Sequence, residues 1–178
     1  MFFVDGENLS MRYRDMLGEN KRPCSHVSFE PNVFVWSRIL NMTQYRNMDI
    51  LRKYYYTSVI GDIDKRHQMH NRLKSLEIEV PKVFRRERGR HSKRVDITLA
   101  VDVLTHAHRK NYDIAVLVAG DEDYVPLVEA TMTEGCRVFL WFFNEKNGLS
   151  EALKRTVDHY FDIGNILFRE HTSGIYTP

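Results

Sequence analysis

The sequence predicts an α/β fold with a mostly parallel sheet and helices on both of its faces. Short runs rich in β-branched and aromatic residues alternate with longer helix-like stretches, which is the pattern of successive βαβ units. The run Ile114–Ala119 is apolar at every position, as expected for a parallel strand buried on both sides. Right-handed crossovers between such strands place helices on both faces of the sheet.

The composition is that of one soluble domain. The chain has 178 residues, of which 43% are apolar and 28% are charged. We expect one domain over residues 1–164 and a tail over residues 165–178. The formal net charge of +2 does not by itself indicate a polyanionic partner. Cys24 and Cys136 stand alone, as reduced thiols do, and no apolar run is long enough for a membrane, so a cytoplasmic protein is expected.

Five strands and five helices are expected along the chain. The strands are expected near residues 2–5, 50–59, 78–84, 114–119 and 137–143. The helices are expected near residues 31–42, 63–77, 93–109, 124–134 and 149–156. Residues 10–30 follow neither period and predict an irregular insertion. The run Phe139–Phe143 is apolar enough to suggest a covered edge strand or a homodimer.

The first strand ends at an aspartate. Asp5 follows an apolar run, and Gly6 permits a sharp turn of the backbone there. Because the carboxyl ends of parallel strands lie along one edge of a sheet, a carboxylate at this point can meet carboxylates from other strands. The alternative is that Asp5 only caps the segment that follows. We favour a functional role because two further acidic segments occur later in the chain.

The helix expected over 93–109 carries Asp96 in the middle of its apolar face. A step of about 100° per residue places Val95 and Leu99 on the same face. A carboxylate turned toward the sheet is costly unless it is paired, hydrogen-bonded or bound to a metal. The alternative is an aspartate satisfied by backbone amides. Asp102 projects onto the polar side of this helix, where we expect a solvated side chain.

A third acidic segment follows the buried 114–119 strand. Gly120 permits a turn, and Asp121 and Asp123 come directly after it. Compensation of a helix dipole is the simpler explanation for Asp123 and for Glu122. It is a weaker explanation for Asp121, which lies at the strand end itself.

Two features of the helix expected over 63–77 have simple explanations. Asp62 is expected to cap the helix, with Asp64 in its first turn. His67 and His70 have the spacing of metal ligands, but no other Cys or His is near them in the sequence. We therefore expect a solvated helix face there.

Converging carboxylates predict a bound cation, because they repel one another without one. Oxygen ligands favour a hard ion, Mg²⁺ or Mn²⁺. A strongly basic stretch leads directly into Asp96 and is expected to contact phosphates through the bidentate fork of its arginines. Its nucleic-acid-binding candidates are Arg85, Arg86, Arg88, Arg90, Lys93 and Arg94.

Three segments of the sequence resemble the NYN domain family, a branch of the PIN-like nucleases. They are Val4–Leu9, Lys93–Asp102 and Gly120–Leu127, which occur in the family's order. The resemblance implies a Rossmann-like PIN fold whose clustered aspartates hold a divalent metal and hydrolyse phosphodiesters, most often in RNA. It matches Asp5, Asp96 and Asp121 to the metal-holding acids, Asp123 to an accompanying acid, Asn8 to the residue that orients the first acid, and Asp102 to a second-tier position.

The combined prediction is a metal-dependent ribonuclease that acts on single-stranded RNA and uses Mg²⁺ or Mn²⁺. Two alternatives remain open at this point. One is an RNA-binding or regulatory module without turnover, suggested by Ala119 where the family usually has Ser or Thr. The other is a metal-dependent phosphohydrolase that acts on nucleotides or DNA, because paired strand-end aspartates serve several α/β enzymes.

Overall fold

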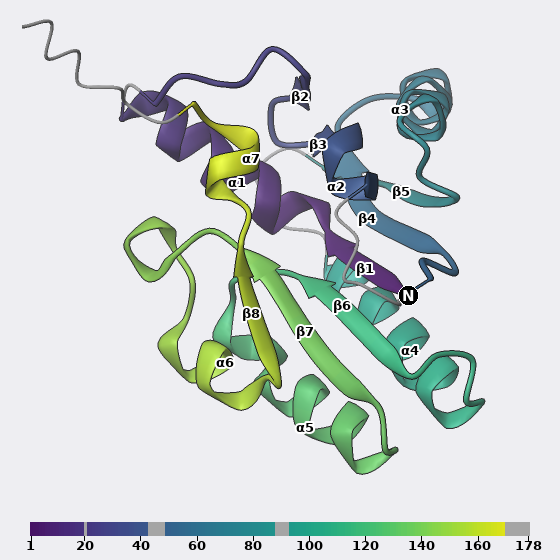
Figure 1. Ribbon diagram of the computed structural model, residues 1–178. Helices are drawn as coiled ribbons and strands as arrows, with labels where there is room; N and C mark the ends of the chain where they lie inside the picture. Colours follow the sequence, from purple (N-terminus) through teal and green to yellow (C-terminus); the bar gives the residue numbers. More distant parts are fainter. Residues whose placement is uncertain (20, 43–48, 88–92, 170–178) are drawn as a thin grey trace, which may run out of the picture.

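The computed structural model describes residues 1–19, 21–42, 49–87 and 93–169. Six parallel strands form the central sheet in the order β5-β4-β1-β6-β7-β8, with helices on both faces (Figure 1). The α/β class is confirmed, and the sheet has one strand more than expected. Its strands are β1 (Phe2–Asp5), β4 (Lys53–Val59), β5 (Val80–Arg85), β6 (Ile114–Val118), β7 (Arg137–Phe142) and β8 (His159–Asp162).

The helices cover both faces of the sheet, and the face of each depends on the direction in which the chain crosses the sheet. Helices α1 (Gly6–Gly18) and α3 (Ile63–Ser75) cover one face, while α4 (Lys93–His108), α5 (Val125–Thr133) and α6 (Glu151–Thr156) cover the other (Figure 1). The short elements are α2 (Arg38–Met42), α7 (Gly164–Leu167) and the 3₁₀ turns η1 (Glu122–Tyr124) and η2 (Glu145–Asn147). No helix in the described part of the chain is both long and apolar enough to cross a membrane.

The chain reverses its direction of travel across the sheet between β1 and β6. From β1 it moves through β4 to β5, and from β6 it moves the opposite way through β7 to β8. Ligands of open α/β sheets bind outside the carboxyl ends of the strands at such a switch point. Asp5 ends β1, and Asp121 follows β6 closely, so the fold places both acids there.

Helix α1 occupies much of the segment for which an irregular insertion was expected. Asp5 caps it by accepting a hydrogen bond from the Asn8 backbone N–H. Leu9, Tyr13 and Met16 recur at helical spacing and are buried. The prediction was wrong because charged residues between them hide this apolar face in the sequence, whereas packing against the sheet stabilises it.

The helix expected over 31–42 is wrong in its first half. Phe34–Ser37 forms β3, which pairs antiparallel with β2 (Val27–Glu30). All four residues of β3 are buried, and a short continuous apolar run does not distinguish a strand from a helix. By contrast, the expected cap of α3 is present, because Asp62 accepts a hydrogen bond from the Lys65 backbone N–H.

The C-terminal part of the described chain contributes to the core. Strand β8, which was not expected, pairs with β7 and covers the apolar run that suggested a homodimer. Leu167 and Phe168, which follow the boundary expected at residue 164, are buried as well. Both cysteines, Cys24 and Cys136, are free thiols.

Candidate active site

Asn8 connects the carboxyl ends of β1 and β6. Its backbone N–H donates to Asp5 Oδ1 at 3.0 Å, and its side-chain Nδ2 donates to Asp121 Oδ2 at 2.9 Å. Its Oδ1 accepts a hydrogen bond from the Gly120 backbone N–H at 2.8 Å. Asn8 was expected to orient Asp5 through its side chain, but the side chain holds Asp121 instead. Helix α1 makes this possible by turning Asn8 back toward the neighbouring strand.

Tyr124 connects Asp5 with Asp96. Its hydroxyl donates to Asp5 Oδ2 at 2.7 Å and lies 3.5 Å from Asp96 Oδ1. Burial, reinforced by the charges of Asp5 and Asp96, raises the pKa of the Tyr124 hydroxyl, so it stays protonated and can donate. The sequence prediction missed this residue. The available signal was its position one residue after Asp123, in the same short turn.

Asp96 lies at the edge of the buried face of α4 rather than in its middle. Val95 and Leu99 are fully buried, whereas Asp96 is exposed. It borders a pocket of about 230 Å³ between α4 and α5. The pocket is lined by Asp96, Ile97, Ala100, Asp121, Asp123, Tyr124 and Leu127. The pocket therefore brings together three of the four predicted acids, and Tyr124 joins them to the fourth, Asp5.

Burial and neighbouring carboxylates make the charged forms of Asp5 and Asp96 costly. Burial raises the pKa of Asp5 to about 7, with smaller contributions from Asp96 and Glu7, against the lowering effect of its hydrogen bonds. The pKa of Asp96 is also raised, first by lost hydration and then by the charge of Glu7. Such shifts mark groups whose charged form is costly in this fold, and they often occur at functional sites.

Glu7 is a further acid that the sequence prediction did not assign. It is 7% exposed, accepts a hydrogen bond from the Ser58 hydroxyl, and lies 3.9 Å from Arg86 Nη1 through its Oε1. A glutamate in the first turn of a helix usually faces solvent near the positive end of the dipole. Here α1 packs against β4, so the same position is buried beside Asp5. Its closeness to Asp5 in sequence was the only signal.

Asp102 lies in a separate network on α4. It accepts hydrogen bonds from the Tyr56 hydroxyl at 2.8 Å and from Lys82 Nζ, and its side chain is only 20% exposed. The expectation of a solvated side chain was wrong, because Lys82 on β5 reaches over the sheet to pair with it. Asp102 is not among the residues that line the acidic pocket.

A comparison with protein families identifies the family of this chain. The NYN domain model matches residues 1–164. This chain belongs to the NYN domain family. NYN domains are nuclease-type domains of the PIN-like superfamily, and nucleic acid is the substrate class that this membership implies.

A solved structure supports the fold of this NYN domain. A protein of unknown function from Vibrio parahaemolyticus superposes with a TM-score of 0.64 at 19% sequence identity, over 94% of this chain and 93% of that chain. At this level of identity the similarity supports the fold alone. Among curated proteins there is no significant match to this chain.

The basic residues expected to bind nucleic acid fall into three groups in the NYN domain. Arg85 and Arg94 are exposed, and the Arg94 guanidinium lies 5.4 Å from the centre of the Phe84 ring. Arg86 is directed inward toward Glu7, with a side chain 14% exposed. Arg88 and Arg90 lie outside the described residues, and so does the side chain of Lys93.

The chemistry of the acidic residues fits a hard divalent cation. Among the described residues, no three His, Cys, Asp or Glu side chains are close enough together to hold a metal ion. The donors around the pocket are nonetheless all oxygens, from Asp96, Asp121 and Asp123, with Asp5 behind them. Burial and neighbouring carboxylates raise the pKa values of Asp5 and Asp96, and a bound cation would offset the cost of their charged forms.

Proposed function

We propose that this NYN domain is a metal-dependent ribonuclease that hydrolyses RNA phosphodiester bonds at Asp5, Asp96, Asp121 and Asp123. The observation that carries the proposal is the Tyr124 hydroxyl between Asp5 and Asp96, beside the pocket that Asp96 shares with Asp121 and Asp123. In support of the proposal, these acids come from three segments of the sequence, and Asp5 and Asp121 lie at the switch point of a nuclease-type fold.

Each residue of the site has a distinct proposed role. Asp5, Asp96 and Asp121 would hold Mg²⁺ or Mn²⁺, while Asp123, exposed at the pocket, orients the attacking water. When bound, such an ion supplies a Lewis acid that offsets charge on the scissile phosphate and acidifies a water. Asn8 is a positioning residue because it fixes the carboxylate of Asp121.

The exposed arginines provide the proposed phosphate contacts. Arg85 and Arg94 are free to meet a nucleic acid backbone, and Arg88, Arg90 and Lys93 belong to the same basic stretch of sequence. Arg86 has a different proposed role, since its guanidinium is directed at Glu7. It balances the buried charge of Glu7 rather than contacting substrate.

A cleavage assay tests the proposal. Labelled single-stranded RNA is incubated with the wild type, with Asp121→Asn and with Asp64→Asn, each in Mn²⁺, Mg²⁺ or EDTA. Asp64 is an exposed aspartate in the first turn of α3 and serves as the matched control. We expect cleavage by the wild type and Asp64→Asn in metal, and none by Asp121→Asn or in EDTA.

Two results of this assay contradict the proposal. Equal cleavage by the wild type and Asp121→Asn would place the chemistry elsewhere. If the wild type binds RNA without cutting it in either metal, a binding module takes the place of the nuclease.

The residue that suggested such a module, Ala119, is fully buried and does not line the acidic pocket.

A further inference from the structure

A second concave surface lies along the free edge of the sheet, between α3, β5 and α4. This groove has a volume of about 720 Å³ and is lined by Arg66, His67, His70, Pro81, Lys82, Val83, Phe84, Arg85, Arg94 and Thr98. Strand β5 is the last strand of the sheet on this side (Figure 1). Its consecutive residues Pro81–Arg85 line the groove.

The charge of this groove is opposite to that of the acidic pocket. Four Lys or Arg side chains and two histidines border it, and no Asp or Glu is among its described lining residues. Lys82 is paired there with the carboxylate of Asp102. Arg66, Arg85 and Arg94 have no carboxylate within ion-pair distance in the described part of the chain. The groove therefore attracts a polyanion.

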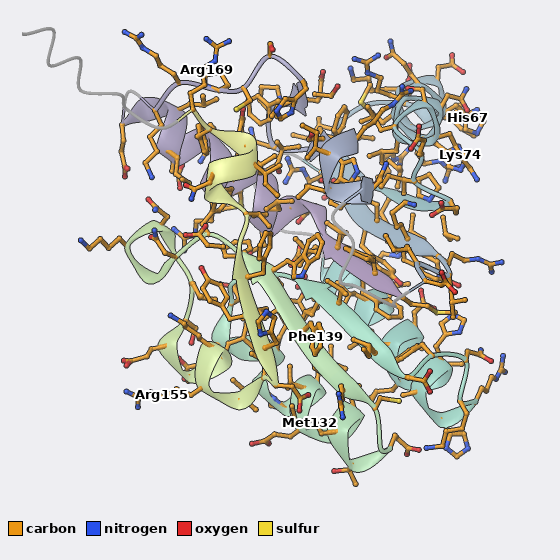
Figure 2. The ribbon with its side chains drawn as sticks, in the orientation of Figure 1. His67, Lys74, Met132, Phe139, Arg155 and Arg169 are labelled. Carbon is orange, nitrogen blue, oxygen red and sulfur yellow. The ribbon has the colours of Figure 1, made fainter. Side chains whose placement is uncertain are left out.

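Flat groups accompany these charges. The Arg94 guanidinium lies over the Phe84 ring, and the imidazoles of His67 and His70 stand on the facing helix. His67 projects from α3 at the outer side of the molecule (Figure 2). Aromatic rings and guanidinium planes beside a positive groove are the features that bind unpaired bases together with their backbone. The bases of a duplex are stacked on one another and are therefore not available to stack on these side chains.

The edge strand itself is poorly suited to a peptide. A peptide would add to β5 as a further strand through backbone hydrogen bonds. Pro81 has no N–H to offer, and Lys82 stands next to it, which are two devices that natural edge strands use against strand addition. The composition of β5 thus favours nucleic acid over an acidic peptide as the occupant.

The groove and the acidic pocket open at the same turn of α4. Arg94 borders the groove and Asp96 borders the pocket, two residues apart in the first turn of the helix. At about 100° per residue these side chains lie on opposite flanks of α4. A nucleic acid strand bound in the groove would therefore pass from Arg94 to the acids on the other flank of α4.

We propose that the groove between α3, β5 and α4 binds single-stranded RNA that flanks the cleaved bond, with Arg66, His67 and His70 of α3 as contacts. This inference rests on the proposed ribonuclease function only for the identity of the bound strand as substrate. It assigns to α3 a binding role that the basic stretch before Asp96 does not include.

Binding measured without catalysis tests the groove. Fluorescence anisotropy of a labelled single-stranded RNA is followed in EDTA, where the proposed cleavage does not run, for the wild type, Arg66→Glu and Arg85→Glu. Arg72→Glu is the matched control, because Arg72 is an exposed arginine of α3 that does not line the groove. Thermal unfolding of each variant verifies that it is folded.

We expect Arg66→Glu and Arg85→Glu each to weaken binding about tenfold, with the slope of log K against log salt reduced by roughly 0.7. Arg72→Glu should bind as the wild type does. Equal affinities of Arg66→Glu, Arg72→Glu and the wild type would overturn the proposal. Duplex RNA that binds as tightly as the single strand would overturn the single-stranded class, and an acidic peptide that binds the wild type but not Arg66→Glu, with RNA unaffected, would assign the groove to peptide.

The cleavage assay separates this proposal from the nuclease proposal. Loss of RNA binding in Arg66→Glu without any cleavage by the wild type would leave the groove standing and remove the nuclease function. Metal-dependent cleavage together with unchanged binding by Arg66→Glu would leave the nuclease function standing and remove the groove as a binding site. If both the groove and the nuclease proposals are correct, Arg66→Glu raises KM for long RNA and leaves kcat near that of the wild type.

Discussion

At the scale of single residues, Tyr124 is the group on which the arrangement of the acids depends most directly. Its hydroxyl contacts both Asp5, at the end of β1, and Asp96, on helix α4. We predict that Tyr124→Phe lowers cleavage while costing about 1–3 kcal/mol of stability, because a buried carboxylate oxygen loses its donor.

Denaturant unfolding and RNA cleavage measured on the same samples check the Tyr124 prediction. Tyr112→Phe is the control, since Tyr112 also donates a buried hydrogen bond, but to the Val103 carbonyl and not to an acid of the site. It should lose similar stability and keep its cleavage. Full activity of Tyr124→Phe would show that the hydroxyl does not position the acids.

The pKa of Asp5 predicts how stability depends on pH in the absence of metal. Burial raises this pKa from 3.8 in the unfolded chain to about 7 in the fold, so between these values the folded state binds the extra proton. Stability therefore falls as pH rises from about 4 to about 7, with Asp96 acting in the same direction.

Asp5→Asn tests this dependence, because asparagine keeps the shape and the capping oxygen of Asp5. Urea unfolding in EDTA at pH 5 and at about pH 8 should show a smaller loss of stability with rising pH in Asp5→Asn than in the wild type. Asp64→Asn should behave like the wild type. The same slope in all three proteins would refute the assignment of the shift to Asp5.

At the scale of elements, the start of α1 determines whether Asp5, Glu7 and Asn8 reach the site. The helix begins so close to β4 that a Cβ on Gly6 would lie 2.1 Å from Tyr55 Cε1 and 2.8 Å from the Tyr56 carbonyl oxygen. Backbone atoms cannot move aside, so α1 would have to shift. Only glycine therefore allows the turn directly after Asp5.

We predict that Gly6→Ala costs about 1–3 kcal/mol of stability and abolishes cleavage, because overpacking displaces α1. Gly18→Ala, at the other end of the same helix, is the control, since a Cβ there has no neighbour within 4 Å. Chemical unfolding of both variants decides this. A wild-type midpoint for Gly6→Ala would mean that the helix has room at its start.

At the scale of the whole molecule, the sheet brings several negatively charged carboxylates to one edge. A cation bound there should stabilise the entire fold, because it offsets their repulsion. We predict that Mn²⁺ raises the melting temperature of the wild type, by an amount equivalent to about 2.7 kcal/mol at a hundred times its dissociation constant. EDTA should reverse the shift, and Asp121→Asn should reduce it. An equal shift in wild type and Asp121→Asn would point to a metal site elsewhere.

The sequence by itself determined the α/β class, the strand-end positions of Asp5 and Asp121, and the helix that carries Asp96. These features follow from local periodicity and from the rule that parallel strands end along one edge. Periodicity failed where it was masked or ambiguous, at α1 and at β3, because burial against the sheet outweighed the local pattern.

Only the tertiary structure decided which side chains serve these acids. Asn8 contacts Asp121 across 113 positions of sequence, and Tyr124 contacts Asp5 across 119. Glu7 is buried, and Lys82 shields Asp102 from solvent. Both effects depend on the way the helices pack on the strands of the sheet. Local sequence encodes the elements and their ends, whereas contacts between distant residues arise only when the sheet assembles and its packing fixes their directions.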